Sequence, residues 1–390
     1  MRAASRAALL GGLLALWGCS SGAGPEIGPD TACGTGAGVI CTWAGDGEAG
    51  WDGDGHSLAA SSFYWPIDLT ITPEGETYIL DWNNHRVRHL RRDGRLETVI
   101  GSDFVGDGPY DAADQVPPGA PGTEVYLNHP THLLPLADGT LLLSSWHNHK
   151  LRHYDPRNGL VQVVCGAGAG FAGDGGPARQ ALLNQPQQCA LAADGSWLVL
   201  DQRNQRVRRI SPAGTISTVV GTGQVGAGGD GGSPLQAQLD LPRGSNPPPG
   251  GAMALAAAGV LYISDTLNHR IRRVDFAADR IETVAGTGVA GYGGDGGPAT
   301  GAALNNPRDL ALGPDGRLYV ADELNHRVRV IDLDQGTIET VAGNGVEGFG
   351  GDGGPAGAAL LNRPVGLEFD GQGRLYIADT YNHRIRRVNP

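Results

Sequence analysis

The chain has 390 residues, 64 of them glycine, and its formal net charge at pH 7 is −12. The glycines follow no Gly-X-Y period, which excludes a collagen-like triple helix. The negative charge excludes the basic footprint of nucleic-acid-binding proteins, so we expect no nucleic-acid partner.

The N-terminus has the pattern of an export signal. Two arginines precede an apolar run over residues 7–17, which is too short to span a membrane as a stable helix. The run ends in Leu16-Trp17-Gly18-Cys19, which resembles a bacterial lipobox apart from the large side chain at its second position. We predict a signal peptide over residues 1–18, a lipid on Cys19 as the sole membrane contact, and a flexible tether over residues 19–38. A plain secretory signal with a chance cysteine is the alternative.

A phrase built on Asn-His-Arg returns six times along the chain. Its asparagines are separated by 64, 56, 64, 57 and 57 residues, which sets a basic unit of 56 or 57 residues. Repetition at a fixed period is typical of architectures in which each unit packs against its neighbours. The six copies begin at Asn84, Asn148, Asn204, Asn268, Asn325 and Asn382.

Each unit contains four strand-like segments separated by turn residues. Short β-rich runs bounded by glycine, aspartate and asparagine are typical of antiparallel hairpins. Four strands per unit in six units predict an all-β fold, a six-bladed β-propeller of four-stranded antiparallel blades. In the fifth unit the segments cover residues 309–312, 318–321, 327–331 and 338–342.

The two ends of the chain are expected to share one blade. The last unit stops at Pro390 after its third strand, and residues 39–45 match the fourth strand of the preceding unit at residues 337–343. A ring must join its ends if no strand edge is to stay unpaired. We therefore expect an N-terminal strand to close the last blade, within a propeller domain over residues 39–390.

These units resemble NHL repeats, which are named for an Asn-His-Leu motif that is mostly Asn-His-Arg here. The linkers, such as Gly293-Gly-Asp-Gly-Gly-Pro-Ala, are similar to those of the bacterial and teneurin-like branch of that family. The resemblance covers residues 39–390 and implies the same propeller fold.

The repeated turn residues are expected to be structural, because equivalent positions on separate blades cannot easily form one active site. Asparagine tolerates a left-handed backbone and can bond its own turn. The residue that ends each second strand is expected to accept a hydrogen bond from the nearby histidine or arginine. These residues are Asp81, Asp201, Asp265, Asp322 and Asp379, while the second unit has Ser145, with Lys150 in place of arginine.

The Gly-Asp-Gly linkers raise the question of calcium binding. Asp52-Gly-Asp-Gly looks like the start of an EF-hand loop, but Phe63 stands at the twelfth position, where that loop needs glutamate. Glycine here is expected to allow positive φ and close packing between blades. We predict no cofactor, and a divalent cation in the central channel is the minor alternative.

The other four cysteines are expected to differ in their bonding. Cys33 and Cys41 flank a glycine-rich segment and could form a disulfide that pins the closing strand. Cys165 is expected in an outer strand and Cys189 in the inner strand of the next blade, about 14 Å apart from three strand spacings. A disulfide needs Cα atoms within roughly 7 Å, so we expect these two to be buried thiols.

Two linkers, residues 101–130 and 221–250, are longer than the others by about 8 residues. Both enter inner strands, so both should lie on one face of the ring, where repeat proteins often carry their binding surface. Neutral variation of exposed loops is the alternative. We expect function on this linker face and not in the repeated turns. Candidate binding residues are Tyr110, Asp111, Tyr126, Arg243 and Asn246.

A second asymmetry lies at the start of the inner strands. NHL repeats usually carry glycine two residues after the proline, and Gly366 keeps it. Because inner strands line the channel, the replacements could converge at its mouth and bind a metal or transfer protons. A solvated polar lining is the alternative. The replacements are Asp68, His132, Gln188, Ala252 and Asp309, and all but the alanine form the candidate site.

The sequence therefore predicts an exported, lipid-anchored NHL-repeat propeller that acts as a binding or scaffold module at the bacterial cell envelope, with a protein or carbohydrate ligand. One alternative is a metal-dependent hydrolase or lyase at the channel mouth that uses Asp68, His132 and Asp309. Another is a purely structural envelope protein. The chain contains no Gly-x-Ser-x-Gly elbow, His-Glu-x-x-His helix or P-loop that would favour an enzyme.

Overall fold

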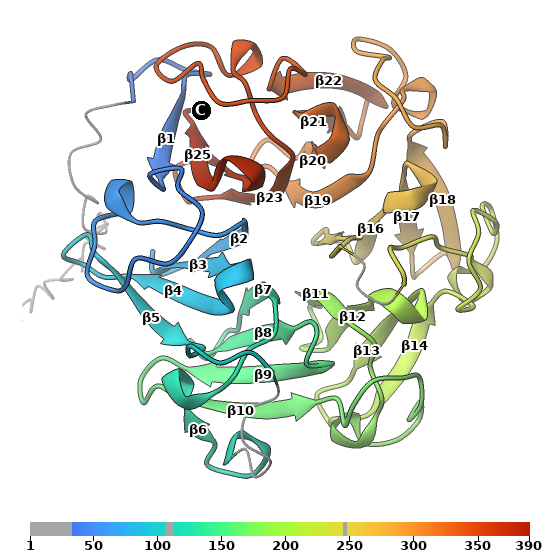
Figure 1. Ribbon diagram of the computed structural model, residues 1–390. Coiled ribbons are helices and arrows are strands. Elements are labelled where there is room, and N and C mark those ends of the chain that lie inside the picture. The colour runs from blue at the N-terminus through green and yellow to red at the C-terminus, as the bar shows by residue number, and fades with distance from the viewer. Residues whose placement is uncertain (1–32, 107–112, 245–247) are drawn as a thin grey trace, which may run out of the picture.

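The computed structural model describes residues 33–106, 113–244 and 248–390. Six antiparallel sheets of these residues stand around a central channel, and the chain visits them in order (Figure 1). The predicted all-β, six-bladed β-propeller is confirmed. The expected signal peptide, Cys19, Tyr110, Asp111 and Asn246 lie outside the described residues.

Each blade begins with a strand at the channel and ends with a strand at the rim. The first blade contains β2 (Pro66–Ile71), β3 (Thr77–Asp81), β4 (Arg86–Leu90) and β5 (Leu96–Ile100). The second contains β7 (Pro130–Pro135), β8 (Leu141–Ser145), β9 (Lys150–Asp155) and β10 (Leu160–Cys165). The third contains β11 (Pro186–Leu191), β12 (Trp197–Asp201), β13 (Arg206–Ile210) and β14 (Ile216–Val220).

The other three blades repeat this order. The fourth contains β15 (Met253–Leu255), β16 (Val260–Asp265), β17 (Arg270–Asp275) and β18 (Arg280–Ala285). The fifth contains β19 (Pro307–Leu312), β20 (Leu318–Asp322), β21 (Arg327–Asp332) and β22 (Thr337–Ala342). The sixth contains β23 (Pro364–Phe369), β24 (Leu375–Asp379), β25 (Arg384–Val388) and β1 (Ile40–Ala44).

Short 3-10 helices complete the described secondary structure. Those that follow a second strand are η2 (Trp82–Asn84), η6 (Gln202–Asn204), η8 (Thr266–Asn268), η10 (Glu323–Asn325) and η12 (Thr380–Asn382). Those in the linkers are η1 (Leu58–Ala60), η3 (Ala113–Gln115), η4 (Gly122–Glu124), η5 (Ala178–Gln180), η7 (Pro234–Gln236), η9 (Ala299–Gly301) and η11 (Ala356–Ala358). Within the described ranges, none of the helices has the length and apolar character needed to span a bilayer.

The ends of the chain close the ring as the sequence predicts. β1 pairs with β25 in antiparallel register, with Ile40 opposite Val388. Beyond the strands, the Gly38 N–H donates to the Asn389 carbonyl over 3.0 Å. A disulfide joins Cys33 to Cys41, whose Cα atoms lie 5.2 Å apart. The closing strand is therefore held by strand pairing on one side and tied to its own lead-in segment.

The second blade differs from the predicted four strands. The long linker before it contains β6 (Ala120–Pro121), which pairs with the outer strand β10 and gives this sheet a fifth strand. The sequence did not indicate this strand, because it is two residues long and is followed directly by the η4 turn.

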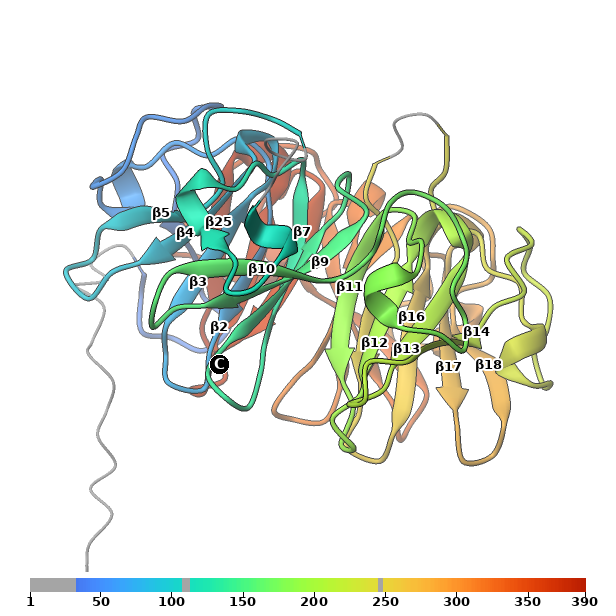
Figure 2. The same cartoon turned by 90° about the horizontal axis from the view of Figure 1, so that it is seen from below.

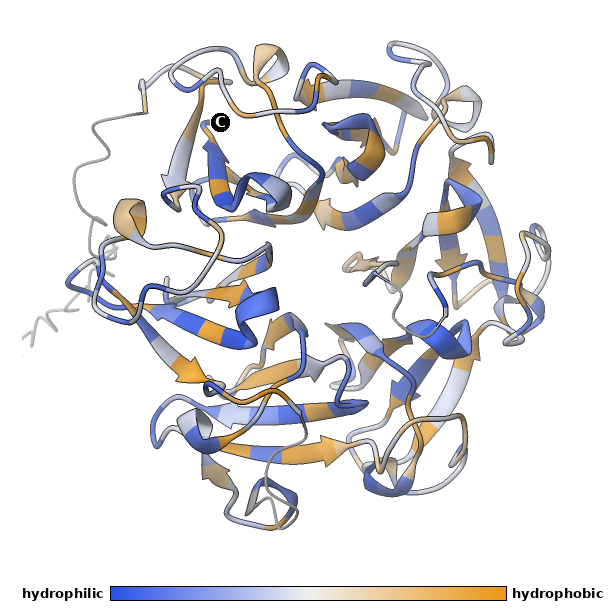
Figure 3. Cartoon of the chain, in the orientation of Figure 1, coloured by the Kyte–Doolittle hydropathy of each residue, from blue (hydrophilic) through white to orange (hydrophobic). Residues whose placement is uncertain are grey.

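The hydrophobic core lies between blades and not within them. Six clusters of buried residues each join two neighbouring blades, because every blade has two faces to cover. Hydrophobic and hydrophilic residues alternate along many of the strands (Figure 3). At the closing interface, Trp43 and Tyr376 of the sixth blade pack with Phe63 and Leu69 near the channel side of the first.

Seen after a 90° turn, strands lie side by side and hairpin loops protrude at the lower edge (Figure 2).

The two remaining cysteines of the described chain lie in the cluster between the second and third blades. Cys165 and Cys189 are both buried free thiols, as expected. Burial raises the pKa of each thiol to about 12, so both stay protonated at neutral pH.

Candidate ligand-binding face around the central channel

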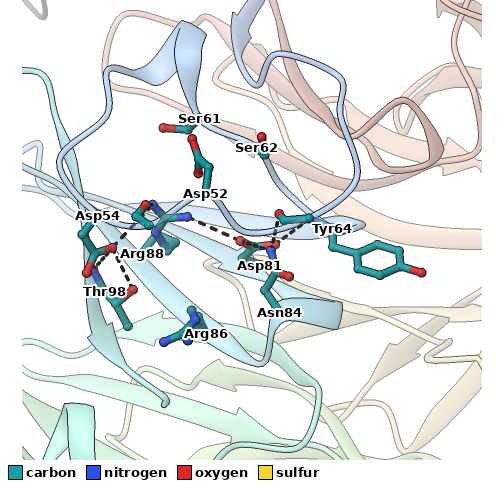
Figure 4. Close-up of polar contacts among 12 residues, drawn as sticks. Asp52, Asp54, Ser61, Ser62, Tyr64, Asp81, Asn84, Arg86, Arg88 and Thr98 are labelled. Carbon is teal, nitrogen blue, oxygen red and sulfur yellow. Dashed lines mark hydrogen bonds and ion pairs between the residues drawn. The ribbon is translucent and has the colours of Figure 1, made fainter. Parts of the chain in front are cut away.

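A buried arginine links the first linker to the end of the second strand in the first blade (Figure 4). The Arg88 guanidinium lies 3.6 Å from the Asp81 carboxylate and 3.5 Å from the Asp54 carboxylate. Asn84 Nδ2 donates to Asp81 over 2.8 Å, and the Thr98 hydroxyl donates to Asp54 over 2.9 Å. Arg88 and Asp81 are both fully buried, so each charge depends on its partner for stability.

The same arrangement recurs in the third to sixth blades. In the first and in the third to sixth blades, the aspartate of one Gly-Asp-Gly segment of the preceding linker is an ion-pair partner of a buried arginine, which accounts for the return of that segment. In the second blade, Ser145 replaces the strand aspartate and Arg152 pairs with Asp114 instead, over 2.9 Å. The other four arginines pair with two aspartates each: Arg208 with Asp201 and Asp174, Arg272 with Asp265 and Asp230, Arg329 with Asp322 and Asp295, and Arg386 with Asp379 and Asp352.

The histidine of each repeated turn forms a joint to the next blade. In the first blade, His85 Nδ1 accepts a hydrogen bond from the His129 N–H of the second blade over 3.1 Å. Gln205 replaces histidine in the third blade, and its Oε1 accepts from the Leu241 N–H over 2.7 Å. The remaining joints are His149 to Gln185, His269 to Asn306, His326 to Arg363 and His383 to Trp65.

These contacts confirm a structural role for the repeated turns but correct its details. The histidine adopts the left-handed backbone that the sequence analysis assigned to asparagine, as at His326 with a φ of 53°. The aspartate accepts from the turn asparagine and from an arginine two positions beyond the motif, as Asp322 does from Asn325 and Arg329. Asparagine is needed for its Nδ2 donor, which bonds both the aspartate and a linker carbonyl.

The repeated turns lie on the same face of the ring as the linkers. Five of the six joints bond the turn to the residue directly before an inner strand, such as Trp65 before Pro66, and the joint of Gln205 bonds Leu241 in the second long linker. The linkers reach the inner strands at this same end. The sequence placed function on the linker face and not in the repeated turns, which suggested two separate regions. In the structure the turns and the linkers share one face of the ring.

An axial pocket opens where the inner strands begin. Its walls come from all six blades, and it contains about 310 Å³ of space that no atom fills, part of it open to solvent. It brings Asp68, His132, Gln188, Ala252 and Asp309 together, as the sequence suggested. Val365 and not Gly366 contributes the sixth blade's side. The lining is completed by Ile67, Thr131, Gln187, Pro249, Gly250, Gly251 and Arg308.

Hydrogen bonds across the pocket connect several blades. Gln188 Nε2 donates to Asp309 Oδ1 over 3.1 Å, and Gln188 Oε1 accepts from the Met253 N–H. Asp309 Oδ2 accepts from the Leu367 N–H over 2.8 Å. The third to sixth blades are thus linked through two of the predicted residues.

A third carboxyl group near the axis, that of Glu368, was not predicted from the sequence. Glu368 follows Gly366 by two residues, so the alternation of strand side chains places it on the same side of β23. Its Oε1 accepts from the Ile71 N–H of the first blade over 3.3 Å. The period of two from the predicted channel position could have identified it.

The two carboxyls of the pocket, Asp68 and Asp309, and the nearby Glu368 lie in an environment that favours their protonated forms. Burial raises the pKa of Asp68, and the charges of Asp309 and Glu368 raise it further. Burial raises the pKa of Asp309 to about 6 and that of Glu368 to about 8. Burial lowers the pKa of His132 to about 3, so this imidazole is neutral at pH 7 and cannot offset the carboxyl charges.

Three side chains that line the pocket carry polar atoms without a hydrogen-bond partner among the described residues. They are Asp68 Oδ2, Gln187 Oε1 and Arg308 Nη1, on side chains of residues that are 7%, 9% and 6% exposed. Leaving such a group unpaired costs about 1–3 kcal/mol. A bound ligand group or water is therefore expected to complete these contacts.

An arc of aromatic side chains, absent from the sequence predictions, lies on the same face. This aromatic arc consists of Tyr381 of the sixth blade, Trp65 and Trp82 of the first, and His129, Trp146 and His147 of the second. The ring centroids of Trp65 and Tyr381, which stack, lie 5.0 Å apart, and those of Trp82 and His129 lie 4.1 Å apart. Trp146 is fully buried beneath His147 at 4.0 Å, whereas the other rings are partly exposed.

The arc breaks the six-fold repeat. Trp82 and Trp146 directly follow the residue that ends the second strand, and the other four blades place polar residues there. Trp146 Nε1 donates to one of these, Gln202, over 2.9 Å. Gln202 in turn accepts from the Gly250 N–H of the second long linker over 3.1 Å. The polar equivalents are Gln202, Thr266, Glu323 and Thr380.

The described linker candidates have local partners. Tyr126 packs against Phe104 with ring centroids 5.3 Å apart. Arg243 forms an ion pair with Asp240, three residues before it. Among the described residues, no three histidine, cysteine, aspartate or glutamate side chains form a group that could hold a metal ion.

Comparison with known proteins agrees with the repeat geometry. A family model described as NHL repeat matches residues 304–331 and 361–388. NHL repeat-containing protein 2 of Bos taurus is 27% identical over 308 residues, which cover 72% of this chain and 40% of that protein. Teneurin-m of Drosophila melanogaster is 27% identical over 354 residues, which cover 83% of this chain and 12% of that protein. The chain thus spans less than half the length of either relative.

Solved structures show the same fold. The structure of an auxiliary nutrient binding protein from Bacteroides thetaiotaomicron aligns with a TM-score of 0.61 and 17% identity. The alignment covers 90% of this chain and 76% of that one. At this identity the similarity establishes the propeller architecture alone.

Proposed function

We propose that this six-bladed NHL-repeat β-propeller is an exported, lipid-anchored binding module of the bacterial cell envelope whose linker face binds carbohydrate. The lipid would be attached to Cys19, ahead of the propeller. No catalytic step and no cofactor form part of this function.

The aromatic arc is the observation that supports carbohydrate as the ligand. Trp65, Trp82 and Tyr381 have partly exposed aromatic rings, and such rings provide a flat surface on which the apolar face of a sugar can stack. Polar groups of the axial pocket lie at the same end of the ring and can bond sugar hydroxyls. Ligand sites commonly combine an aromatic lining with a few such polar groups. The fold similarity to a nutrient binding protein is consistent with a binding role.

A glycan array probed with the purified mature protein tests this function. We expect a defined set of glycans to bind, and we expect their binding to fall when Trp82→Ala alters the arc. An array without any bound glycan, repeated with envelope polysaccharide, would refute the carbohydrate function and leave a protein ligand as the next candidate.

A second candidate is a hydrolase or lyase at the channel mouth. The raised pKa values of Asp68, Asp309 and Glu368 support it, because carboxyls that hold protons near neutral pH can act as general acids. Incubation of a bound glycan with the wild type and with Asp68→Asn would detect cleavage. Cleavage by the wild type alone would favour the enzyme over the binding module.

A further inference from the structure

The unpartnered atoms of the axial pocket include two oxygens that need a donor. Asp68 uses Oδ1 to accept from the Leu69 N–H over 2.9 Å, and its Oδ2 has no partner among the described residues. Gln187 comes from a different blade, and its Oε1 is likewise unpartnered and buried. A group with several donors, placed between these blades, would satisfy both oxygens.

The ionisable groups that line the pocket include two buried carboxyls. Burial raises the pKa of Asp68 and of Asp309, and the charge of Asp309 raises that of Asp68 further, so a cation placed beside them would stabilise their ionised forms. Arg308 also lines the pocket, but its Nε lies 2.6 Å from Glu323 Oε2, and this pair is buried. His132 is neutral at pH 7. A cation would therefore be favoured here over a carboxylate or a phosphate.

We propose that the axial pocket takes the protonated primary amine of a carbohydrate ligand, with Asp68 Oδ2 and Gln187 Oε1 as its acceptors. An ammonium group has three donors and no acceptor, which matches two buried oxygens that lack a donor, and its charge would favour the ionised form of Asp68. This inference rests on the carbohydrate-binding function proposed above and narrows it to sugars with a free amine. The unpartnered Nη1 of Arg308 would bond a neighbouring hydroxyl oxygen of the same sugar.

Two oligosaccharides that differ in the amine alone provide the probe. Calorimetric titration of the mature protein at pH 7 would compare a trimer of glucosamine with the matching trimer of N-acetylglucosamine. We expect the free-amine trimer to bind at least about ten-fold more tightly, because acetylation removes the charge that the buried carboxyls attract. Lowering the pH to 5 should weaken this preference, because Asp309, whose pKa burial raises to about 6, becomes protonated in this interval.

Two pocket variants and one control assign the effect to the pocket. Asp68→Asn and Asp309→Asn keep the side-chain shape and should each reduce the preference for the amine to less than about three-fold. Glu74→Gln removes an equal charge from an exposed loop between β2 and β3, on the opposite face, and should leave the preference unchanged. Equal binding of the two trimers by the wild type, or an unchanged preference in both folded pocket variants, would overturn the inference.

Failure of the carbohydrate function can be told apart from failure of this inference. Binding of other glycans without any preference for a free amine would refute the amine site alone. If no glycan binds, titration with n-butylammonium against n-butanol tests the pocket directly. Binding of n-butylammonium that Asp68→Asn abolishes would support an amine site, and its absence would refute that site.

Discussion

The Nδ1 atom of His383 in the sixth blade accepts a hydrogen bond from the backbone N–H of Trp65 in the first blade, over 3.3 Å. These residues lie 318 positions apart in the chain, so this bond joins the last blade to the first. Trp65 also stacks on Tyr381 of the sixth blade within the aromatic arc. The joint that closes the ring therefore also positions part of the proposed binding face.

The joint histidines should contribute to stability through the acceptor they supply. His326→Ala leaves the Arg363 N–H without its partner and places alanine at a left-handed φ, so it should lower the free energy of unfolding by about 1–3 kcal/mol. His326→Gln should cost less than about 1 kcal/mol, since Gln205 makes the same joint in the third blade. Urea unfolding measures both. Equal destabilisation by the two substitutions would contradict the hydrogen-bonding role.

The buried arginines should be far more costly to remove than exposed ones. Arg329→Ala would leave the Asp322 charge buried without its cation and should cost about 3–5 kcal/mol. The control is Arg280→Ala, which breaks an ion pair with Glu282 at the exposed rim and should cost no more than about 1 kcal/mol. Thermal unfolding of the two variants under the same conditions makes the comparison. Similar losses for both would show that the Asp-Arg-Asp arrangement is not what stabilises the linkers.

The N-terminal strand should be essential for the closed ring. Deleting residues 31–45 removes β1 and exposes the unpaired edge of β25, so the protein should melt at a lower temperature or aggregate. Replacing Cys33 and Cys41 with serine keeps the strand and loses the disulfide alone, which should cost about 2–3 kcal/mol. Light scattering and thermal melting distinguish the two. An unchanged melting temperature after the deletion would refute closure by β1.

The pH dependence of stability should reveal the carboxyl of Glu368. Its pKa in the folded protein is raised from 4.5 to about 8, so the folded state keeps a proton that the unfolded chain releases in this interval. Because the folded state binds more protons here, this group makes stability fall as the pH rises from 4.5 to 8. Glu368→Gln removes the effect and keeps the acceptor for the Ile71 N–H. Its stability relative to the wild type should therefore increase with pH, and a difference that is constant or decreases with pH would contradict the raised pKa.

The ring could be predicted because its information is repeated. Six copies of one unit indicate blade number, strand order and the convergence of equivalent inner-strand positions at the axis. The match between residues 39–45 and 337–343 indicates the closing strand from the sequence alone. Asp68, His132, Gln188 and Asp309 were placed correctly by this reasoning, since equivalent residues of a ring must face the same axis.

The remaining features depend on contacts that no period reveals. Trp65, Trp82 and Tyr381 occupy three different positions of the repeat on two blades, so their proximity emerges only from the packing of those blades. The joints of the histidines run to backbone N–H groups, which carry no mark in the sequence. The arginine that donates to the strand aspartate lies two positions beyond the motif, as Arg329 does for Asp322. The prediction favoured the histidine and arginine of the motif itself because they are nearer in the sequence.

The affinity for a glycan identified on the array, measured for the folded Trp82→Ala and Phe276→Ala variants, tests the proposed binding face most directly. Trp82 belongs to the aromatic arc, whereas Phe276 is an exposed aromatic residue in the hairpin between β17 and β18, on the opposite face. We expect Trp82→Ala to weaken binding by at least about ten-fold and Phe276→Ala to leave it unchanged. Wild-type affinity in Trp82→Ala, or an equal loss in Phe276→Ala, would show that carbohydrate does not bind on the linker face.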